Sequence, residues 1–248
     1  GLYMQGIKVG YAHRWARSSE APEPGAVATG SIAVLSLHVA DAVKTVEVEE
    51  TRYYAGEAPF GLLEATLVQR SPQGTTAGKV VAVAGALLAW SGDLTATPKR
   101  LVPTKETLNS VLTQSPSPRD DLELGRTQRV VVFDFEALAD RAVEVTPTQL
   151  KSVEHAGIQL PAVELKLRDE ASDIAQVALF TTGGVALQMQ LTPELVLKLE
   201  TEATAKAAIV GMTAPLGAAP TAQEAAVAPP AAEACDGGDM AACTELGL

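Results

Sequence analysis

Two cysteines and three histidines are the side chains of this sequence best suited to nucleophilic or metal chemistry. A catalytic cysteine needs a histidine packed beside it as a general base. Cys235 and Cys243, however, lie in the last fourteen residues, and no histidine follows His155. The histidines also lack a metal-ligand spacing such as H-x-x-x-H; they are His13, His38 and His155. The sequence therefore predicts no catalytic residue, no metal site and no cofactor, and we expect the chain not to be an enzyme.

Carboxylates are abundant, and paired carboxylates can perform acid–base catalysis when burial separates their pKa values. The alternation of the strand around Glu47 and Glu49 places both on its outward face, which favours a solvated surface. The segment Asp236-Gly-Gly-Asp239 lacks the further ligands and the final glutamate of a calcium loop. We interpret it as a link between two helices, with Asp239 as the cap of the second.

Composition excludes several classes of partner. The net charge of −11 and the pI near 4.8 argue against binding to nucleic acid or to an anionic membrane surface. The longest apolar run, Val80–Trp90, is broken by Gly85 and falls short of the roughly 20 residues of a membrane helix. The sequence thus predicts no transmembrane span. It begins inside a patterned segment at Gly1, so we expect the natural chain to start upstream.

Residues 1–211 are predicted to form an antiparallel β-rich domain, because apolar side chains recur with a period of two. Turns are expected at Ser71–Gly74 and at Gly183-Gly184. A helix is expected over Thr104–Gln114, with Thr104 as its N-cap, and a second over Glu200–Val210. The predicted strands are Leu2–Trp15, Ser31–Val39, Val43–Tyr53, Gly61–Arg70, Gly78–Trp90, Gln128–Phe135, Ala142–Val153, Ile158–Arg168, Ile174–Thr181 and Val185–Leu191.

Residues 212–233 have the composition of a linker. They are rich in alanine and proline and poor in large apolar side chains, which is typical of a flexible or semi-extended segment. A short helix over Thr221–Val227 is the alternative, since the prolines lie outside that stretch. Residues 234–248 then form a separate region, in which helical signals resume.

Three phrases of the β-rich domain resemble a family of bacterial envelope proteins. They are Tyr3-Met-Gln-Gly-Ile-Lys-Val-Gly-Tyr11, Pro59-Phe-Gly-Leu-Leu63 and Glu200-Thr-Glu-Ala-Thr-Ala-Lys206. Some members of that family precede a transglutaminase-like domain, and others are solitary lipoproteins similar to lipoprotein carriers. The resemblance implies an α+β, mainly β fold, in which a long curved antiparallel sheet (a half-barrel) wraps around one or two helices. It also implies an exported, periplasmic or envelope-associated protein.

The C-terminal end resembles the first helix of a Sel-one-like repeat, a branch of the tetratricopeptide class. The resemblance rests on Ala242, Leu246 and Gly247 in the phrase Ala242-Cys-Thr-Glu-Leu-Gly247. Such a repeat cannot bury its apolar face alone, so further repeats are expected beyond Leu248. In exported members of that family, a cysteine pair spaced like Cys235 and Cys243 bridges neighbouring helices. The resemblance therefore implies a disulfide in an oxidising compartment and two buried thiols in the cytosol.

Together these features predict a non-catalytic protein-interaction or scaffold protein of the bacterial cell envelope, with another protein as its partner. A second hypothesis is a carrier of an apolar ligand or lipid on the concave face of the sheet. That hypothesis predicts a continuous pocket lined by the inward residues of Ile32–Leu37, Leu62–Val68 and Val80–Leu88. A third is an accessory domain of a transglutaminase-like enzyme whose catalytic part lies elsewhere.

Overall fold

The protein is a mainly β structure built on one long antiparallel sheet. The computed structural model describes residues 1–39, 42–113, 123–170 and 175–206. These residues form a single fourteen-stranded sheet and two short helices, α1 (Leu108–Thr113) and α2 (Glu202–Lys206). The expected fold class, mainly β with a curved antiparallel sheet and few helices, is confirmed. None of the described helices is long and apolar enough to span a membrane.

The strands follow one another along the chain with short connections. The first eight are β1 (Leu2–Met4), β2 (Ile7–Ser19), β3 (Ala26–Val39), β4 (Ala42–Tyr54), β5 (Leu62–Ser71), β6 (Gly74–Val83), β7 (Ala86–Ser91) and β8 (Lys99–Leu101). The other six are β9 (Gln128–Asp134), β10 (Ala139–His155), β11 (Ile158–Asp169), β12 (Ala175–Thr181), β13 (Ala186–Gln190) and β14 (Leu195–Lys198).

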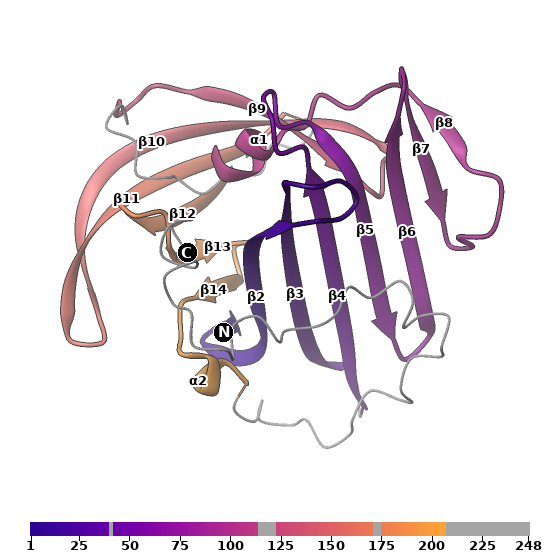
Figure 1. The fold of residues 1–248 in the computed structure, drawn as a ribbon. Helices are drawn as coiled ribbons and strands as arrows, with labels where there is room; N and C mark the ends of the chain where they lie inside the picture. Colours follow the sequence, from indigo (N-terminus) through magenta and orange to yellow (C-terminus); the bar gives the residue numbers. More distant parts are fainter. Residues whose placement is uncertain (40–41, 114–122, 171–174, 207–248) are drawn as a thin grey trace.

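The sheet consists of two meanders joined by two short strands, β1 and β14. The spatial order runs from β8 back to β1, then through β14 back to β9, so only the β1–β14 pair joins strands distant in sequence. Figure 1 shows β2–β7 on one side of the molecule and the strongly curved β10–β11 hairpin on the other, with α1 between them at one end. The two ends of the strand order are thus brought towards each other.

Two turns divide segments that sequence analysis predicted as single strands. The predicted strand Leu2–Trp15 is divided by a two-residue turn at Gln5 and Gly6, with φ of 49° and 83°. The predicted strand Gly78–Trp90 is likewise a hairpin of β6 and β7, with Gly85 at φ 69° in its turn. Two-residue hairpin turns require such positive φ values. The turns predicted after β5 and after β12 are confirmed.

The helix predicted over 104–114 forms later than expected. It begins at Leu108, and its cap is Thr107, whose hydroxyl accepts a hydrogen bond from the Ser110 backbone amide at 3.3 Å. The prediction that Thr104 caps the helix was wrong, because the Thr104 hydroxyl donates to the Asp140 carboxylate instead. The residues between Pro103 and the helix therefore have non-helical backbone, and Thr107 forms an isolated bridge with Gly61.

Buried side chains form two clusters, one on each side of the molecule. The first belongs to β9–β13 and contains Val130, Val132, Val143, Val145, Val163, Leu165, Leu167, Ala178, Phe180 and Met189. The second contains Tyr54, Leu62, Ala65, Val80, Leu87 and Ala89 from β4–β7, together with Phe133 from β9. Leu108 and Val111 of α1 pack against the second cluster. The helix therefore packs against the face of β4–β7 that carries this cluster, as expected.

The junction between the two meanders carries an ionic cluster centred on Glu200. Its carboxylate accepts hydrogen bonds from the Tyr3 hydroxyl and from Lys8 Nζ, the latter at 2.8 Å. The Glu200 side chain is only 12% exposed. Although this burial opposes ionisation, the hydrogen bonds from Lys8 and Tyr3 lower the pKa of Glu200 to about 2. The charged carboxylate therefore stabilises the junction.

This cluster predicts a pH-dependent contribution to stability. The pKa of Glu200 is lowered on folding from 4.5 to about 2, so its contribution is complete above pH 4.5 and is lost as the pH falls towards 2. We expect Glu200→Gln to cost about 1.5–3 kcal/mol at pH 7 and progressively less below pH 4.5. Urea unfolding at pH 7 and pH 3 measures this, with the exposed Glu194→Gln as control; an equal loss for Glu200→Gln at both pH values would contradict it.

Residues 212–233 and 234–248 lie outside the described residues, and with them the predicted linker and repeat. The same holds for all five candidate positions of that region: Cys235, Ala242, Cys243, Leu246 and Gly247. The disulfide and the repeat signature therefore stay predictions.

Candidate functional site

The face of β2–β7 that packs against α1 and β9 is here called the inner face. Paired residues of neighbouring strands point to the same face of a sheet. The register therefore aligns Arg14, Ser31 and Glu50 in one row across β2, β3 and β4. Arg52 lies two residues beyond Glu50 on the same face. The inner face thus carries three charged side chains close together on adjacent strands.

A buried carboxylate, Glu106, joins this face to the rest of the molecule. Glu106 lies just before α1 and is 1% exposed. Its Oε1 accepts a hydrogen bond from the Tyr54 hydroxyl at 2.7 Å. Its Oε2 accepts one from the Phe133 backbone amide at 2.5 Å and is ion-paired with Arg52. These four residues are called the Glu106 network below.

The network ties together three segments that are far apart in sequence. Arg52 also donates to the Phe133 carbonyl at 3.1 Å and is ion-paired with Glu50. Burial opposes the charge of Arg52, but Glu50 and Glu106 raise its pKa above the ordinary value. Burial, reinforced by Glu106, likewise raises the pKa of the Tyr54 hydroxyl. Arg52 is therefore charged and Tyr54 neutral at physiological pH.

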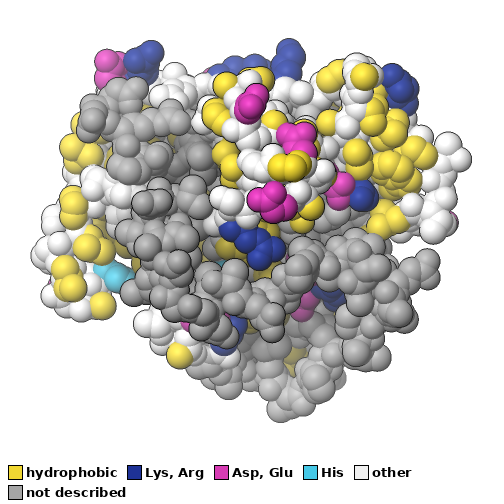
Figure 2. Space-filling model, in the orientation of Figure 1, with side chains coloured by type: hydrophobic (Ala, Val, Ile, Leu, Met, Phe, Trp, Pro, Cys, Tyr) yellow, Lys and Arg dark blue, Asp and Glu magenta, His cyan; other side chains and the backbone are white. Residues whose placement is uncertain are grey.

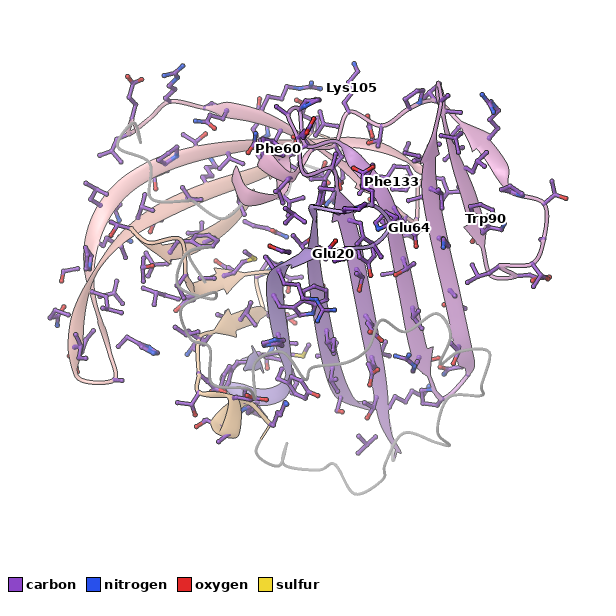
Figure 3. The ribbon with its side chains drawn as sticks, in the orientation of Figure 1. Glu20, Phe60, Glu64, Trp90, Lys105 and Phe133 are labelled. Carbon is purple, nitrogen blue, oxygen red and sulfur yellow. The ribbon has the colours of Figure 1, made fainter. Side chains whose placement is uncertain are left out.

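The Glu106 network is a structural connection between elements. Among the described residues, no buried side-chain nitrogen or oxygen lacks a hydrogen-bond partner. The Glu106 carboxylate is 1% exposed and accepts from three donors, all of them groups of the protein itself. Figure 3 shows Phe133 near the ends of β4 and β5, with Lys105 at the rim. The network therefore fixes the segment before α1 and the end of β9 onto the inner face.

Arg14 differs from Arg52 in having no such partners. Its side chain is exposed to solvent, yet the surrounding protein removes enough hydration to lower the pKa of the guanidinium, an effect that Glu50 partly offsets. Glu50 itself is ion-paired with Arg52. Within the described part of the chain, the Arg14 side chain forms no ion pair and no hydrogen bond. Arg14 is thus a cation that water reaches within a concave surface.

The pocket predicted for an apolar ligand is filled along two of its three strands. The inward residues of β5 and β6, including Leu62, Ala65 and Val80, are buried against Phe133 and α1. Phe135 covers the next row, because a Cβ at Gly78 would lie 3.2 Å from its ring.

Among the described residues, small pockets lie at the β6–β8 end of the sheet beside Trp90, with volumes of about 170 and 240 Å³. Figure 2 shows hydrophobic side chains gathered there. These volumes fall below the roughly 300–1,000 Å³ of ligand pockets.

A second feature is a two-stranded arm formed by residues 149–161. β9 pairs with β10 only up to Val145, and β12 pairs with β11 only from Ala162 onwards. Beyond these points β10 and β11 pair with each other alone, through a two-residue turn at Ala156 and Gly157 with φ of 50° and 80°. In Figure 1 the arm extends away from the other strands at the left.

One face of the arm carries three apolar side chains, beside Lys151 and His155. Val153 and Leu160 are cross-strand partners, and Ile158 lies on the same face two residues from Leu160. The Ile158 side chain is 63% exposed. An isolated two-stranded ribbon is marginally stable in water, so an exposed apolar face on it is more costly than scattered surface residues. We call Val153, Ile158 and Leu160 the arm patch.

The residues that sequence analysis singled out for chemistry do not come together. Glu47 and Glu49 lie on the face opposite Arg52, as expected, where Arg70 bonds to both at 2.6 and 3.2 Å. His13 lies in β2 and His155 at the tip of the arm. No group of three or more His, Cys, Asp or Glu side chains in the described residues could hold a metal ion.

Sequence analysis missed Glu106, Arg14 and the arm patch. Glu106 reads as an ordinary acidic residue near a helix N-terminus, and nothing in the local pattern indicates its burial. Arg14 follows His13 in an alternating strand, where a charge usually marks the solvent face. The available signal was that His13 and Arg14 follow one another in β2. Consecutive residues of a strand point to opposite faces, so both faces of β2 carry a polar group.

Comparison with known proteins supports the fold alone. No family model and no curated protein matches the sequence. A crystal structure of a β-barrel-like protein of domain of unknown function DUF1849 from Brucella abortus is similar, with a TM-score of 0.53 and 9% identity over 80% of this chain and 93% of that one. A DUF1089 family protein from Pseudomonas aeruginosa gives a TM-score of 0.38 and 13% identity, over 73% of this chain and 90% of that one. The fold thus belongs to the class of curved, barrel-like antiparallel sheets.

Proposed function

We propose that this chain is a non-catalytic protein-binding domain and that it binds its partner through the arm patch. The observation that carries the proposal is the exposure of Ile158 on a ribbon that neighbouring strands do not cover. Burying such a side chain in an interface contributes about 1.5–3 kcal/mol. The small pocket volumes favour a protein over a small apolar ligand as the bound partner.

The base of the arm is built to hold it in place. Thr148 donates to Glu164 at 2.9 Å, and Lys151 is ion-paired with the same carboxylate, which lowers the pKa of Glu164. The Ser152 hydroxyl bonds to Gln159 at 2.9 Å across the ribbon. A ribbon fixed in this way presents its apolar face with little loss of conformational entropy on binding.

Substitution in the arm patch tests the proposal. We expect tagged Ile158→Asp protein to lose, by about tenfold or more, a partner that co-purifies with the unsubstituted protein from the envelope fraction of its own cells. Val102→Asp is the matched control, because Val102 is 83% exposed and lies far from the arm in sequence. The melting temperatures of both variants should stay unchanged. Equal recovery of the partner with both variants would contradict the proposal, and absence of the protein from the envelope fraction would contradict the expected location.

A further inference from the structure

The arm also carries an exposed leucine on the face opposite the arm patch. Consecutive residues of a strand point to opposite faces, so Leu150, three residues before Val153, lies on the other face of the ribbon. Leu150 is 64% exposed, as much as Ile158 of the arm patch at 63%. A partner that contacted the arm patch alone would leave this leucine in water.

Leu150 lies where the apolar inner surface of β10 and β11 continues onto the arm. Its cross-strand partner is Val163, which is fully buried in the first cluster. Pro161, two residues before Val163, points to the same face and is exposed. The apolar surface therefore extends beyond the part of the ribbon that neighbouring strands cover. We call Leu150 and Pro161 the base patch.

The two faces of the arm differ in where their apolar side chains lie. On one face, the arm patch adjoins the turn, since Ile158 directly follows Gly157. On the other face, the base patch lies at the end of the arm away from the turn, and the part near the turn is polar. These polar side chains are Ser152, Glu154 and Gln159. A partner that buries both patches must therefore contact both the tip and the base of the ribbon.

The arm has one carboxylate without an ion-pair partner. Lys151, the lysine of the arm, is ion-paired with Glu164. Within the described residues, Glu154 forms no ion pair, and its side chain is exposed. The chain has a net charge of −11, so a second copy of it would be repelled on average rather than attracted. A cation on a different protein complements Glu154.

Burial of both patches requires a partner that surrounds the arm. A flat surface contacts one face of a ribbon, whereas a cleft contacts both. In Figure 1 the arm extends away from the other strands, so both of its faces can be approached. Each further apolar side chain removed from water adds to the affinity.

We propose that the partner of this chain is a protein that receives the arm in an apolar cleft. One wall of the cleft covers the arm patch. The opposite wall covers the base patch and places a cation beside Glu154. This inference rests on the proposed function, because it takes the arm as the binding site, and it adds the shape and the charge of the partner.

Photo-crosslinking from both faces tests the enclosure of the arm. A photoreactive amino acid is placed at position 150, 158 or 102 of the whole chain in its own cells. We expect positions 150 and 158 to give a product with the same second protein, identified by mass spectrometry, and position 102 to give none.

The possible failures of this experiment are distinguishable. A product from position 158 without one from position 150, or with a different protein from each, would overturn the enclosure and leave the proposed function standing. The absence of a product from position 158 would contradict the proposed function itself. A product that contains two differently tagged copies of this chain would overturn the choice of another protein as the partner.

Substitution at Leu150 tests whether the two faces act together. With the photoreactive amino acid at position 158, Leu150→Asp should lower the yield of the product at least about tenfold, whereas Leu150→Met should stay within about threefold. Val102→Asp is the matched control, and the melting temperatures of these variants should stay unchanged. Equal yields with Leu150→Asp and Val102→Asp would overturn the role of the base patch. The crosslink from position 150 decides the matter if Leu150→Asp alters the ribbon.

Reversal of the charge at Glu154 tests the cation of the partner. Glu154→Lys should lower the yield from position 158 at least about tenfold, and Glu154→Asp should stay within about threefold. Glu136→Lys makes the same change of charge in the exposed turn between β9 and β10 and should leave the yield unchanged. Equal yields with Glu154→Lys and Glu136→Lys would overturn the cation assigned to the partner.

Discussion

Replacing Glu106 with alanine is expected to lower the free energy of unfolding by about 3–5 kcal/mol, because the substitution removes the buried carboxylate that is ion-paired with Arg52 and leaves Arg52 with Glu50 alone. It also removes the acceptor of the Tyr54 hydroxyl and of the Phe133 amide. Glu106→Gln keeps one oxygen acceptor and should lose less, about 1.5–3 kcal/mol. Urea unfolding followed by circular dichroism measures both changes.

Two further variants separate the stability cost of a buried charge that has lost its partner from the cost of losing an exposed ion pair. Glu64→Ala removes the partner of Lys79, 2.9 Å away at the surface, and should cost at most about 1 kcal/mol. Adding Arg52→Met to Glu106→Ala should recover part of the loss, since the buried Arg52 charge is then removed and the Glu50 carboxylate left behind is partly exposed. A Glu106→Ala variant as stable as Glu64→Ala would show that the network does not hold the inner face together.

Phe133→Ala is expected to cost about 3–5 kcal/mol, because the ring is 3% exposed and its removal leaves a cavity in the second buried cluster. Phe133 also makes an edge-to-face contact with Phe135, with ring centres 5.6 Å apart. Its backbone bonds to Glu106 and Arg52 survive the substitution, so the effect reports on side-chain packing alone. Chemical denaturation gives the value.

The control for Phe133 is Leu124→Ala. Leu124 is 51% exposed, and its truncation should change stability by no more than about 0.5 kcal/mol. A loss below 1 kcal/mol for Phe133→Ala would show that β9 does not pack against β5–β7 in solution. The curled arrangement of the sheet would then lack its main contact.

The period-two pattern of the sequence was sufficient to predict the architecture. Alternation such as Val46-Glu47-Val48-Glu49 identifies strands with one buried face, and Gly183-Gly184 identifies a hairpin. Sequence analysis missed the turn at Gln5, because a glutamine with positive φ is not a usual turn signal, and the turn at Gly85 within an apolar run. It also placed the start of α1 too early. The expected helix on the inner face is present, since Leu108 and Val111 have helical spacing and a complementary apolar sheet.

The candidate surfaces could not be predicted in the same way, since they depend on which strands stop pairing. Nothing in the sequence of β10 and β11 distinguishes the arm from the part covered by β9 and β12. The lengths of the neighbouring strands decide that difference. The burial of Glu106 follows from contacts with Tyr54 and Phe133, which are far from it in sequence.

Site-specific photo-crosslinking in the native cells is the most direct test of protein binding through the arm. A photoreactive amino acid is placed at Ile158 in one protein and at Val102 in another, and both are irradiated under the same conditions. The proposal predicts one discrete crosslinked product with a second protein from position 158 and none from position 102. Irradiation that leaves position 158 uncrosslinked, or that gives the same products from both positions, would contradict it.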